Sequence, residues 1–253
     1  MNLCDVSVIV TTCDEEANIA RCLDKLDGFG EIIVVDSFST DRTLDIIRSY
    51  AAAAYVRPYH SAAQQKNWAL DCVRNDWVLI LDADESLSSG LTNEIRGLND
   101  NDARDGYWMF RESHYLGSPI RRCGWQRDKV LRLFKRSRGR YEEKAVHEEV
   151  ALRGTAGILK NKLQHYPYRV LEQHFDKINE YSSRGARDYL DRGGRIPLLR
   201  MLFNPPFRFL RMYVLQRGFL DGSKGFILCL MSAYSVFLKY AKAWERKICR
   251  DAS

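Results

Sequence analysis

The sequence has no paired-cysteine motif, no signal-peptide pattern and no uncharged run long enough to cross a bilayer. Its seven cysteines are scattered, odd in number and contain no Cys-x-x-Cys pair, so neither a zinc site nor a disulfide framework is indicated. The first residues lack a basic patch followed by an apolar segment. Gly225 to Leu238 has fourteen residues without a charge, whereas a spanning helix needs about 20 apolar residues. We therefore expect a protein of the reducing cytoplasm without a spanning helix.

Acidic residues are scarce in the last quarter of the chain, and the charge is distributed unevenly. Of 253 residues, 45% are hydrophobic and 28% are charged, as in ordinary globular proteins. From Arg184 to Arg250 there are fourteen Lys and Arg but four Asp and Glu, so this part carries +10 and the remainder −4. Such asymmetry indicates a surface for anions, with anionic lipid and nucleic acid as the candidates.

The order of apolar runs predicts an α/β domain followed by helices. Runs of strand character at 6–11, 31–36, 52–56 and 77–82 alternate with helical patterns that begin near 14, near 39 and at the capping residue Ser61, which is typical of a parallel, doubly wound sheet. Runs at 106–111 and 130–135 lack a clear intervening helix and indicate mixed or antiparallel pairing. A helix is expected over 170–190, and Gly193-Gly194 then breaks the chain. We predict a catalytic domain over 1–193 and a basic, amphipathic helical region over 194–253.

Two carboxylates follow the apolar run that ends at Leu81. Ligands of open α/β sheets bind at the carboxyl ends of the strands, and Asp82 and Asp84 lie on one side of an extended segment. Because two nearby carboxylates repel, a hard cation such as Mg²⁺ or Mn²⁺ is expected between them, with substrate phosphates as its further ligands. Alone, the same residues also fit a polar turn after a core strand.

Three motifs in order resemble family 2 glycosyltransferases of the GT-A fold. They are Val6-Ser7-Val8-Ile9-Val10, the segment from Asp36 to Thr43, and Asp82-Ala83-Asp84. Further matches resemble the branch that contains bacterial lipopolysaccharide-core β-glucosyltransferases: Arg132-Leu133-Phe134, Val146-His147-Glu148-Glu149, Gly218-Phe219-Leu220-Asp221-Gly222, Gly225-Phe226 and Phe237-Leu238-Lys239-Tyr240. The resemblance implies a GT-A, Rossmann-like nucleotide-diphospho-sugar transferase fold with a C-terminal helical extension.

The resemblance also implies roles for donor-binding residues. Asp36 would accept a hydrogen bond from the nucleotide base, most often uracil, although Ser37 stands where the family usually has a second Asp. Asp82 would contact the ribose or the metal shell, and Asp84 would ligate Mn²⁺ or Mg²⁺. Lys66 and Asn67 are candidates for donor binding, with an exposed helix start as the alternative. Two arginines, Arg132 and Arg136, are candidates for contact with a diphosphate or an anionic acceptor, with a solvated strand face as the alternative.

Inversion at the sugar carbon requires a base for the acceptor hydroxyl. Many members of the family that the chain resembles supply this base from a Glu-Asp pair after the metal motif. No such pair occurs here, and Val146-His147-Glu148-Glu149 stands at about the expected position. The resemblance therefore implies Glu148 as the base, with Glu149 second and Asp128 third. Neighbouring strand residues point to opposite faces, so Glu148 and Glu149 are not expected to share the role. His147 faces either the phosphates and metal or the sheet interior.

The predicted function is metal-dependent, inverting transfer of a hexose, first of all glucose, from a UDP-sugar to a lipopolysaccharide-core or other lipid-linked saccharide. The basic, aromatic C-terminal region fits a peripheral enzyme on the inner face of the cytoplasmic membrane, and equally fits helices that pack on the catalytic domain. An undecaprenyl-diphosphate saccharide and a peptide or protein are alternative acceptors. A basic nucleic-acid-binding protein is the alternative from a different class, although no nucleic-acid motif is present, and a nucleotide-sugar-binding protein without catalysis is a third reading.

Overall fold

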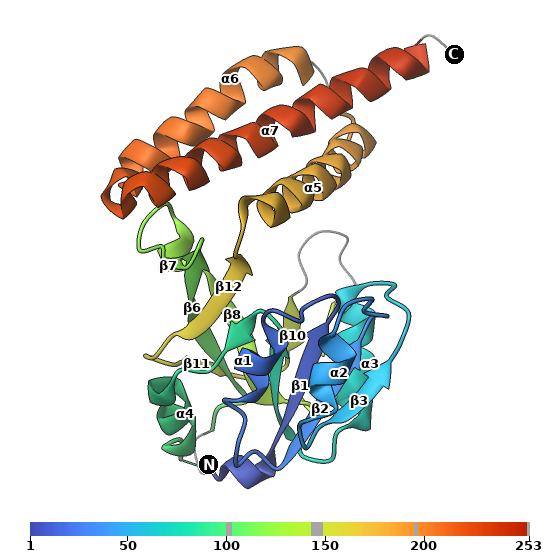
Figure 1. Ribbon diagram of the computed structural model, residues 1–253, viewed down its shortest axis with the longest axis vertical. Coiled ribbons are helices and arrows are strands. Elements are labelled where there is room, and N and C mark those ends of the chain that lie inside the picture. The colour runs from blue at the N-terminus through green and yellow to red at the C-terminus, as the bar shows by residue number, and fades with distance from the viewer. Residues whose placement is uncertain (100–102, 143–148, 195–196, 252–253) are drawn as a thin grey trace. The chain divides into compact units, whose positions relative to one another are not determined.

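The structure is a computed structural model that describes residues 1–99, 103–142, 149–194 and 197–251 (Figure 1). The chain forms two compact units. The first comprises Met1–Glu112 and Arg127–Tyr166, and the second comprises Ser113–Gln126 and Pro167–Ser253.

The first unit contains a mixed sheet with helices on both faces. Its main strand order is β3-β2-β1-β4-β8-β6-β12-β5, and β11 also pairs with β6. The strands are β1 (Val6–Thr12), β2 (Glu31–Asp36), β3 (Ala53–Val56), β4 (Trp77–Asp82), β5 (Glu85–Ser86), β6 (Gly106–Tyr115), β8 (Lys129–Lys135), β9 (Gly139–Tyr141), β10 (Val150–Leu152), β11 (Ala156–Ile158) and β12 (Leu163–Tyr168). The helices are the 3₁₀ turn η1 (Leu3–Asp5), α1 (Ile19–Leu23), α2 (Thr43–Ile47), α3 (Ala62–Cys72) and α4 (Ser89–Arg96).

Strand direction confirms the predicted fold class. β3, β2, β1 and β4 are mutually parallel, while β8 runs antiparallel to both β4 and β6. Val8 and Val10 of β1 pack on the face covered by α1, α2 and α4, whereas Ile9 packs on the face covered by α3. The apolar runs of β1, β2 and β4 are continuous because both faces of these strands are buried, whereas β3 is exposed along its length. The predicted cap of α3 is also present, since the Ser61 hydroxyl accepts a hydrogen bond from the Gln64 amide at 3.2 Å.

The second unit consists of helices together with a loop inserted from the sheet. Its elements are β7 (Ser118–Pro119), the turn η2 (Trp125–Arg127), α5 (Leu171–Asp191), α6 (Pro197–Leu210), the π-helical turn η3 (Arg211–Leu215), the 3₁₀ turn η4 (Gly218–Asp221) and α7 (Gly222–Asp251). The Asp221 carboxylate accepts hydrogen bonds from the amides of Arg121 and Arg122 at 3.1 and 2.8 Å. The motif noted at 218–222 thus fixes the inserted loop.

Helix α5 belongs to the same compact unit as α7. The Lys242 ammonium of α7 donates hydrogen bonds to the Asn179 carbonyl at 2.7 Å and to the Ser182 hydroxyl at 2.8 Å, both on α5. The aromatic rings of Tyr189 and Tyr240 also meet edge to face. The boundary predicted after residue 193 therefore lies inside the second unit, between α5 and α6.

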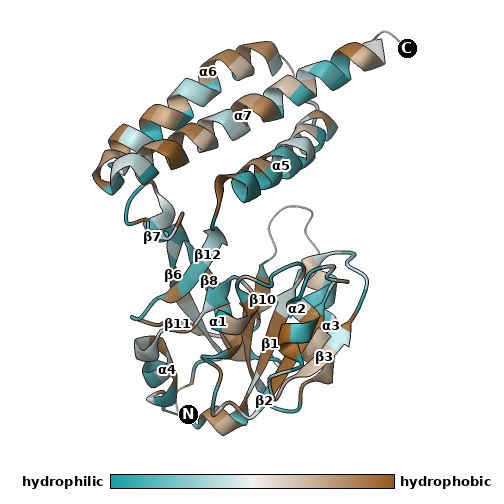
Figure 2. Ribbon diagram, viewed as in Figure 1, coloured by the Kyte–Doolittle hydropathy of each residue, from teal (hydrophilic) through white to brown (hydrophobic). Residues whose placement is uncertain are grey.

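The C-terminal helix is longer than the uncharged run alone suggested. Within the residues described, the segment Gly218–Cys249 is the one segment long and apolar enough to cross a membrane by length and composition. A third of its most apolar stretch, 33%, is buried within the protein. Helix α6 carries two consecutive prolines in its interior, Pro205 and Pro206. Figure 2 shows apolar residues along α6 and α7 and many polar residues on α5.

Candidate active site

The register of the parallel strands brings the predicted acidic residues to one edge of the sheet. Thr11 lies opposite Asp82 in the β1–β4 pairing, and Thr12 lies opposite Asp36 in the β1–β2 pairing. The Ala83 amide donates a hydrogen bond to the Thr11 carbonyl at 3.0 Å, which continues the ladder past the end of β4. Asp36 and Asp82 therefore share the carboxyl edge, where α/β sheets bind ligands.

Asp82 lies between two buried cations. Its Oδ1 is 2.9 Å from the Lys66 ammonium and accepts a hydrogen bond from the Thr11 hydroxyl at 3.1 Å, while its Oδ2 pairs with the Arg132 guanidinium. Burial alone would raise the pKa of the Asp82 carboxyl, but the charges of Arg132 and Lys66 hold it well below its usual range. Desolvation likewise opposes the charge on Lys66, yet the Asp82 carboxylate raises the pKa of that ammonium. All three groups are therefore charged at neutral pH.

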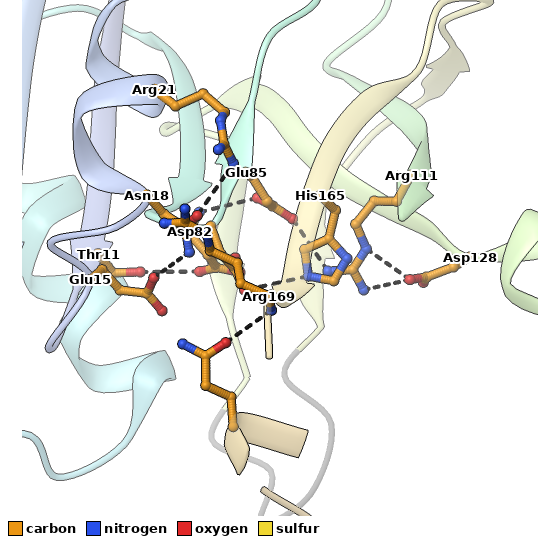
Figure 3. A network of polar contacts seen from close by, with 12 residues as sticks. Thr11, Glu15, Asn18, Arg21, Asp82, Glu85, Arg111, Asp128, His165 and Arg169 are labelled. Atoms are coloured by element: carbon orange, nitrogen blue, oxygen red, sulfur yellow. Dashed lines mark hydrogen bonds and ion pairs between the residues drawn. The ribbon is translucent and has the colours of Figure 1, made fainter. Parts of the chain in front are cut away.

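Arg132 links Asp82 to a second, buried carboxylate. Its guanidinium also lies 2.8 Å from Glu85, whose side chain has 0% exposure. Arg111 lies 3.2 Å from Glu85 and 2.7 Å from Asp128 (Figure 3). Arg132 is thus a buried ion-pairing residue and not part of a solvated strand face, and Asp128 is held in an ion pair. Sequence reasoning missed Glu85 and Arg111, although Glu85 directly follows the Asp82-Ala83-Asp84 motif.

Asp84 has a histidine as its neighbour. β5 and β12 pair antiparallel with Glu85 opposite His165, and the Tyr166 amide donates a hydrogen bond to the Asp84 carbonyl at 2.8 Å. This pairing places His165 Nε2 at 3.5 Å from Asp84 Oδ2. Sequence analysis did not select His165, because β12 lies about eighty residues beyond the motif.

These two side chains provide one oxygen and one nitrogen donor suited to a divalent metal. Carboxylate oxygen binds Mg²⁺ and Mn²⁺, whereas imidazole favours transition metals. Among the residues that the structure describes, no cluster of three or more His, Cys, Asp or Glu side chains is arranged to hold a metal ion.

Asp36 organises the loop that follows β2. Its Oδ2 accepts a hydrogen bond from the Ser39 amide at 2.9 Å, and its Oδ1 accepts one from the Ser39 hydroxyl. Phe38 adopts a left-handed φ of 59° in this turn. Asp36 itself has 0% exposure, so in this conformation its carboxylate holds the loop and does not face solvent.

Lys66 and Asn67 are adjacent on α3 but have different roles in the structure. Lys66 is 5% exposed and pairs with Asp82, so it is not part of an exposed helix start. The Asn67 amide group bonds the backbone of Tyr141 in both directions, each at 2.9 Å, and so fixes β9 to α3.

Two polar atoms near these cations are buried without a hydrogen-bond partner within the described part of the chain. They are Arg132 Nε and the Tyr141 hydroxyl. The Tyr141 ring centroid lies 5.3 Å from the Lys66 ammonium.

Arg136, the other candidate for contact with a diphosphate, bonds to the backbone. It donates hydrogen bonds to the Val73 and Arg74 carbonyls at 2.6 and 3.2 Å and thereby ties β8 to the end of α3.

The predicted base, Glu148, and its neighbour His147 lie outside the described residues. Glu149 is described, and its carbonyl accepts a hydrogen bond from the Glu142 amide at 3.0 Å. The assignment of Glu148 stays a prediction.

Comparisons with known proteins agree on one family. The model of the family described as Glycosyl transferase family 2 matches residues 7–166. The chain is similar to the lipopolysaccharide core biosynthesis glycosyltransferase LpsC of Rhizobium meliloti (strain 1021), with 30% identity over 249 residues, covering 95% of this chain and 92% of the relative. It is also 30% identical over 253 residues to an uncharacterized glycosyltransferase of Rickettsia typhi (strain ATCC VR-144 / Wilmington), covering 95% and 87% respectively.

A solved structure supports the fold. The mannosyltransferase PcManGT from Pyrobaculum calidifontis, in complex with GDP-Man and Mn²⁺, aligns with a TM-score of 0.53 and 16% identity, covering 95% of this chain and 87% of that one.

Proposed function

Because the chain belongs to glycosyl transferase family 2, and is therefore a glycosyltransferase of the GT-A fold, we propose that it is an inverting, metal-dependent hexosyltransferase. Its donor is a UDP-sugar, with glucose as the first candidate sugar. Its acceptor is a lipopolysaccharide-core or other lipid-linked saccharide. The cluster around Asp82 and Asp84 at the carboxyl edge of the sheet carries this proposal.

Charge supports the division of roles between the two carboxylates. Asp82 is already neutralised by Lys66 and Arg132, so we assign it to orienting the ribose and the shell around the metal. Asp84, with His165 beside it, is the residue that would hold Mn²⁺ or Mg²⁺. The bound metal supplies Lewis-acid stabilisation of the departing nucleoside diphosphate.

Other residues of the chain bind the donor. At the end of β2, Asp36 accepts a hydrogen bond from the uracil imide. Lys66 and Arg132 hold the Asp82 carboxylate in place at the donor site, and Asn67 supports the position of α3. Glu148 takes the proton of the acceptor hydroxyl as the sugar carbon is attacked.

The acceptor assignment rests on the relative from Rhizobium meliloti, whose name refers to lipopolysaccharide core biosynthesis. A lipid-linked acceptor also gives the basic C-terminal region a purpose as a peripheral anchor on the cytoplasmic face of the membrane. An undecaprenyl-diphosphate saccharide remains the second candidate acceptor. The alternative of a nucleic-acid-binding protein loses its support, because the chain belongs to an enzyme family.

Calorimetric titration tests the donor site. UDP, GDP and ADP are each titrated with and without Mn²⁺ into the wild type, Asp84→Asn and the control Asp45→Asn, a surface carboxylate of α2 whose side chain is 66% exposed. We expect UDP to bind and Mn²⁺ to strengthen its binding. Asp84→Asn should remove the contribution of Mn²⁺, and Asp45→Asn should retain it. Binding of GDP or ADP in preference to UDP, or binding without any metal linkage, would contradict the proposed donor site.

A turnover assay with lipid-linked acceptors tests the base. Glu148→Gln should lower kcat by about 10²-fold or more, because it removes the proton acceptor, while leaving UDP affinity unchanged. Glu149→Gln should remain active. The reverse pattern would move the role to Glu149.

A further inference from the structure

Helix α6 presents an apolar stripe that stays exposed among the described residues of its own unit. Its exposed members recur at helical spacing through η3, and the most exposed are Leu202 at 65% and Phe203 and Phe207 at 63% each. We call this set the α6 stripe: Leu199, Leu202, Phe203, Phe207, Leu210 and Val214. The spacing follows one side of a helix. A contiguous apolar surface of this kind marks an interaction site.

Charge identifies the occupant of the stripe. Between Asp191 and Asp221 the chain has six arginines and no acidic residue. Among them, Arg200, Arg208 and Arg211 are exposed. An apolar stripe bordered by arginines complements a surface that is apolar inside and anionic outside, which is the interface of an anionic bilayer.

A second arrangement on the membrane is possible in principle, in which α7 spans the bilayer. The packing of α7 argues against it. Leu228, Cys229 and Ala243 are fully buried within the helical unit, and Lys242 bonds α7 to Asn179 and the serines of α5. Because α5 is bonded to α7, a spanning α7 would bring α5 into the bilayer as well. Helix α5 bears Glu172, Asp176, Lys177, Glu180, Arg184, Arg187, Asp188 and Asp191, and each such charge is costly in hydrocarbon.

We propose that the α6 stripe lies in the plane of an anionic membrane, with its apolar residues in the interface and its arginines on lipid headgroups. The inference deepens the proposed peripheral anchoring and rests on it. Nucleotide binding at the Asp82–Asp84 site does not depend on it, so the two proposals fail separately.

Sedimentation of the full-length protein with vesicles tests the stripe. The vesicles contain phosphatidylcholine alone or a mixture with phosphatidylglycerol, and bound protein is measured at low and high salt. The test variant is Phe203→Ala/Phe207→Ala. The matched control is Phe237→Ala/Trp244→Ala, which removes two exposed aromatic side chains from α7. UDP titration of each variant verifies that the nucleotide site is intact.

The wild type should bind mixed vesicles, release them at high salt, and leave the membrane on carbonate extraction. Phe203→Ala/Phe207→Ala should weaken binding at least tenfold, and the α7 control should change it less than threefold. Each of Arg200→Gln and Arg211→Gln should weaken binding about fivefold. Equal or greater loss in the α7 variant, no binding to anionic vesicles, resistance to carbonate, or a dimer that the α6 variant dissociates would overturn the proposal.

Discussion

Arg132 is the side chain on which two carboxylates of the site depend. It contacts Asp82 and the fully buried Glu85, and burial makes the loss of either partner expensive. Removing one member of a buried ion pair leaves an uncompensated charge, which costs more than the pair itself contributes.

Arg132→Met should therefore destabilise the first unit by about 3 kcal/mol, within the range for breaking a buried pair. The measurement is urea unfolding followed by tryptophan fluorescence. The control Arg140→Met removes an arginine that pairs with Asp71, where the two side chains are 50% and 63% exposed, and should cost less than about 1 kcal/mol. Similar losses in both variants would show that Arg132 acts as an ordinary surface cation.

At the scale of elements, α5 is fixed at its start by a neutral histidine. His174 Nδ1 and the Tyr115 hydroxyl are hydrogen-bonded at 2.9 Å, and the His174 ring stacks on Tyr168 with centroids 4.1 Å apart. Desolvation, with a smaller contribution from Lys177, lowers the pKa of His174 to about 4. The same burial raises the pKa of Tyr115 to about 12.

This helix anchor makes the stability of the second unit depend on pH. Between the ordinary histidine pKa of about 6.5 and the folded value, the unfolded chain binds more protons than the folded one, so stability falls as pH falls. The contribution is fully present above pH 6.5 and is lost progressively towards pH 4. Between pH 8 and pH 5, His174 alone should remove about 2 kcal/mol from the free energy of unfolding.

Denaturant titrations of wild type and His174→Gln over this pH range provide the measurement. The difference between the two proteins isolates His174 from other titrating groups. A constant difference from pH 8 to pH 5 would mean that His174 keeps its ordinary pKa in the folded state.

At the scale of the whole molecule, the two compact units should respond to different ligands. On the proposed function, UDP with Mn²⁺ would bind the folded first unit and stabilise it by mass action. Hydrogen exchange should therefore slow at the ends of β1 and β4 on adding UDP and Mn²⁺, and in α6 on adding anionic vesicles. Equal protection of both units by either ligand would contradict this separation.

The central strands of the sheet could be predicted from the sequence because they are buried on both faces. Val6 to Val10 and Val78 to Leu81 carry that pattern locally, and the acids that follow them mark the ligand edge. The partners of those acids could not be predicted. Lys66 and Arg132 reach Asp82 from positions 16 and 50 residues away, and neither has a local pattern that signals burial.

The extent of the helical unit could not be predicted from local sequence either. Gly193-Gly194 marks a change in composition, but Lys242 reaches Asn179 across 63 residues, and only the folded chain brings these groups together. Tertiary contacts of this kind, and not local composition, place α5 in the second unit.

The two prolines of α6 set a limit on how deep that helix can lie. In a regular helix the amides at positions 205 and 206 would bond to the carbonyls of Met201 and Leu202, but Pro205 and Pro206 have no amide hydrogen to donate. A carbonyl without a partner is costly in hydrocarbon. If α6 lies in the membrane interface as proposed, interfacial water that reaches this turn would satisfy these carbonyls. Helix α6 would then rest at the level of the lipid glycerol groups, with the rings of Phe203 and Phe207 extending towards the acyl chains.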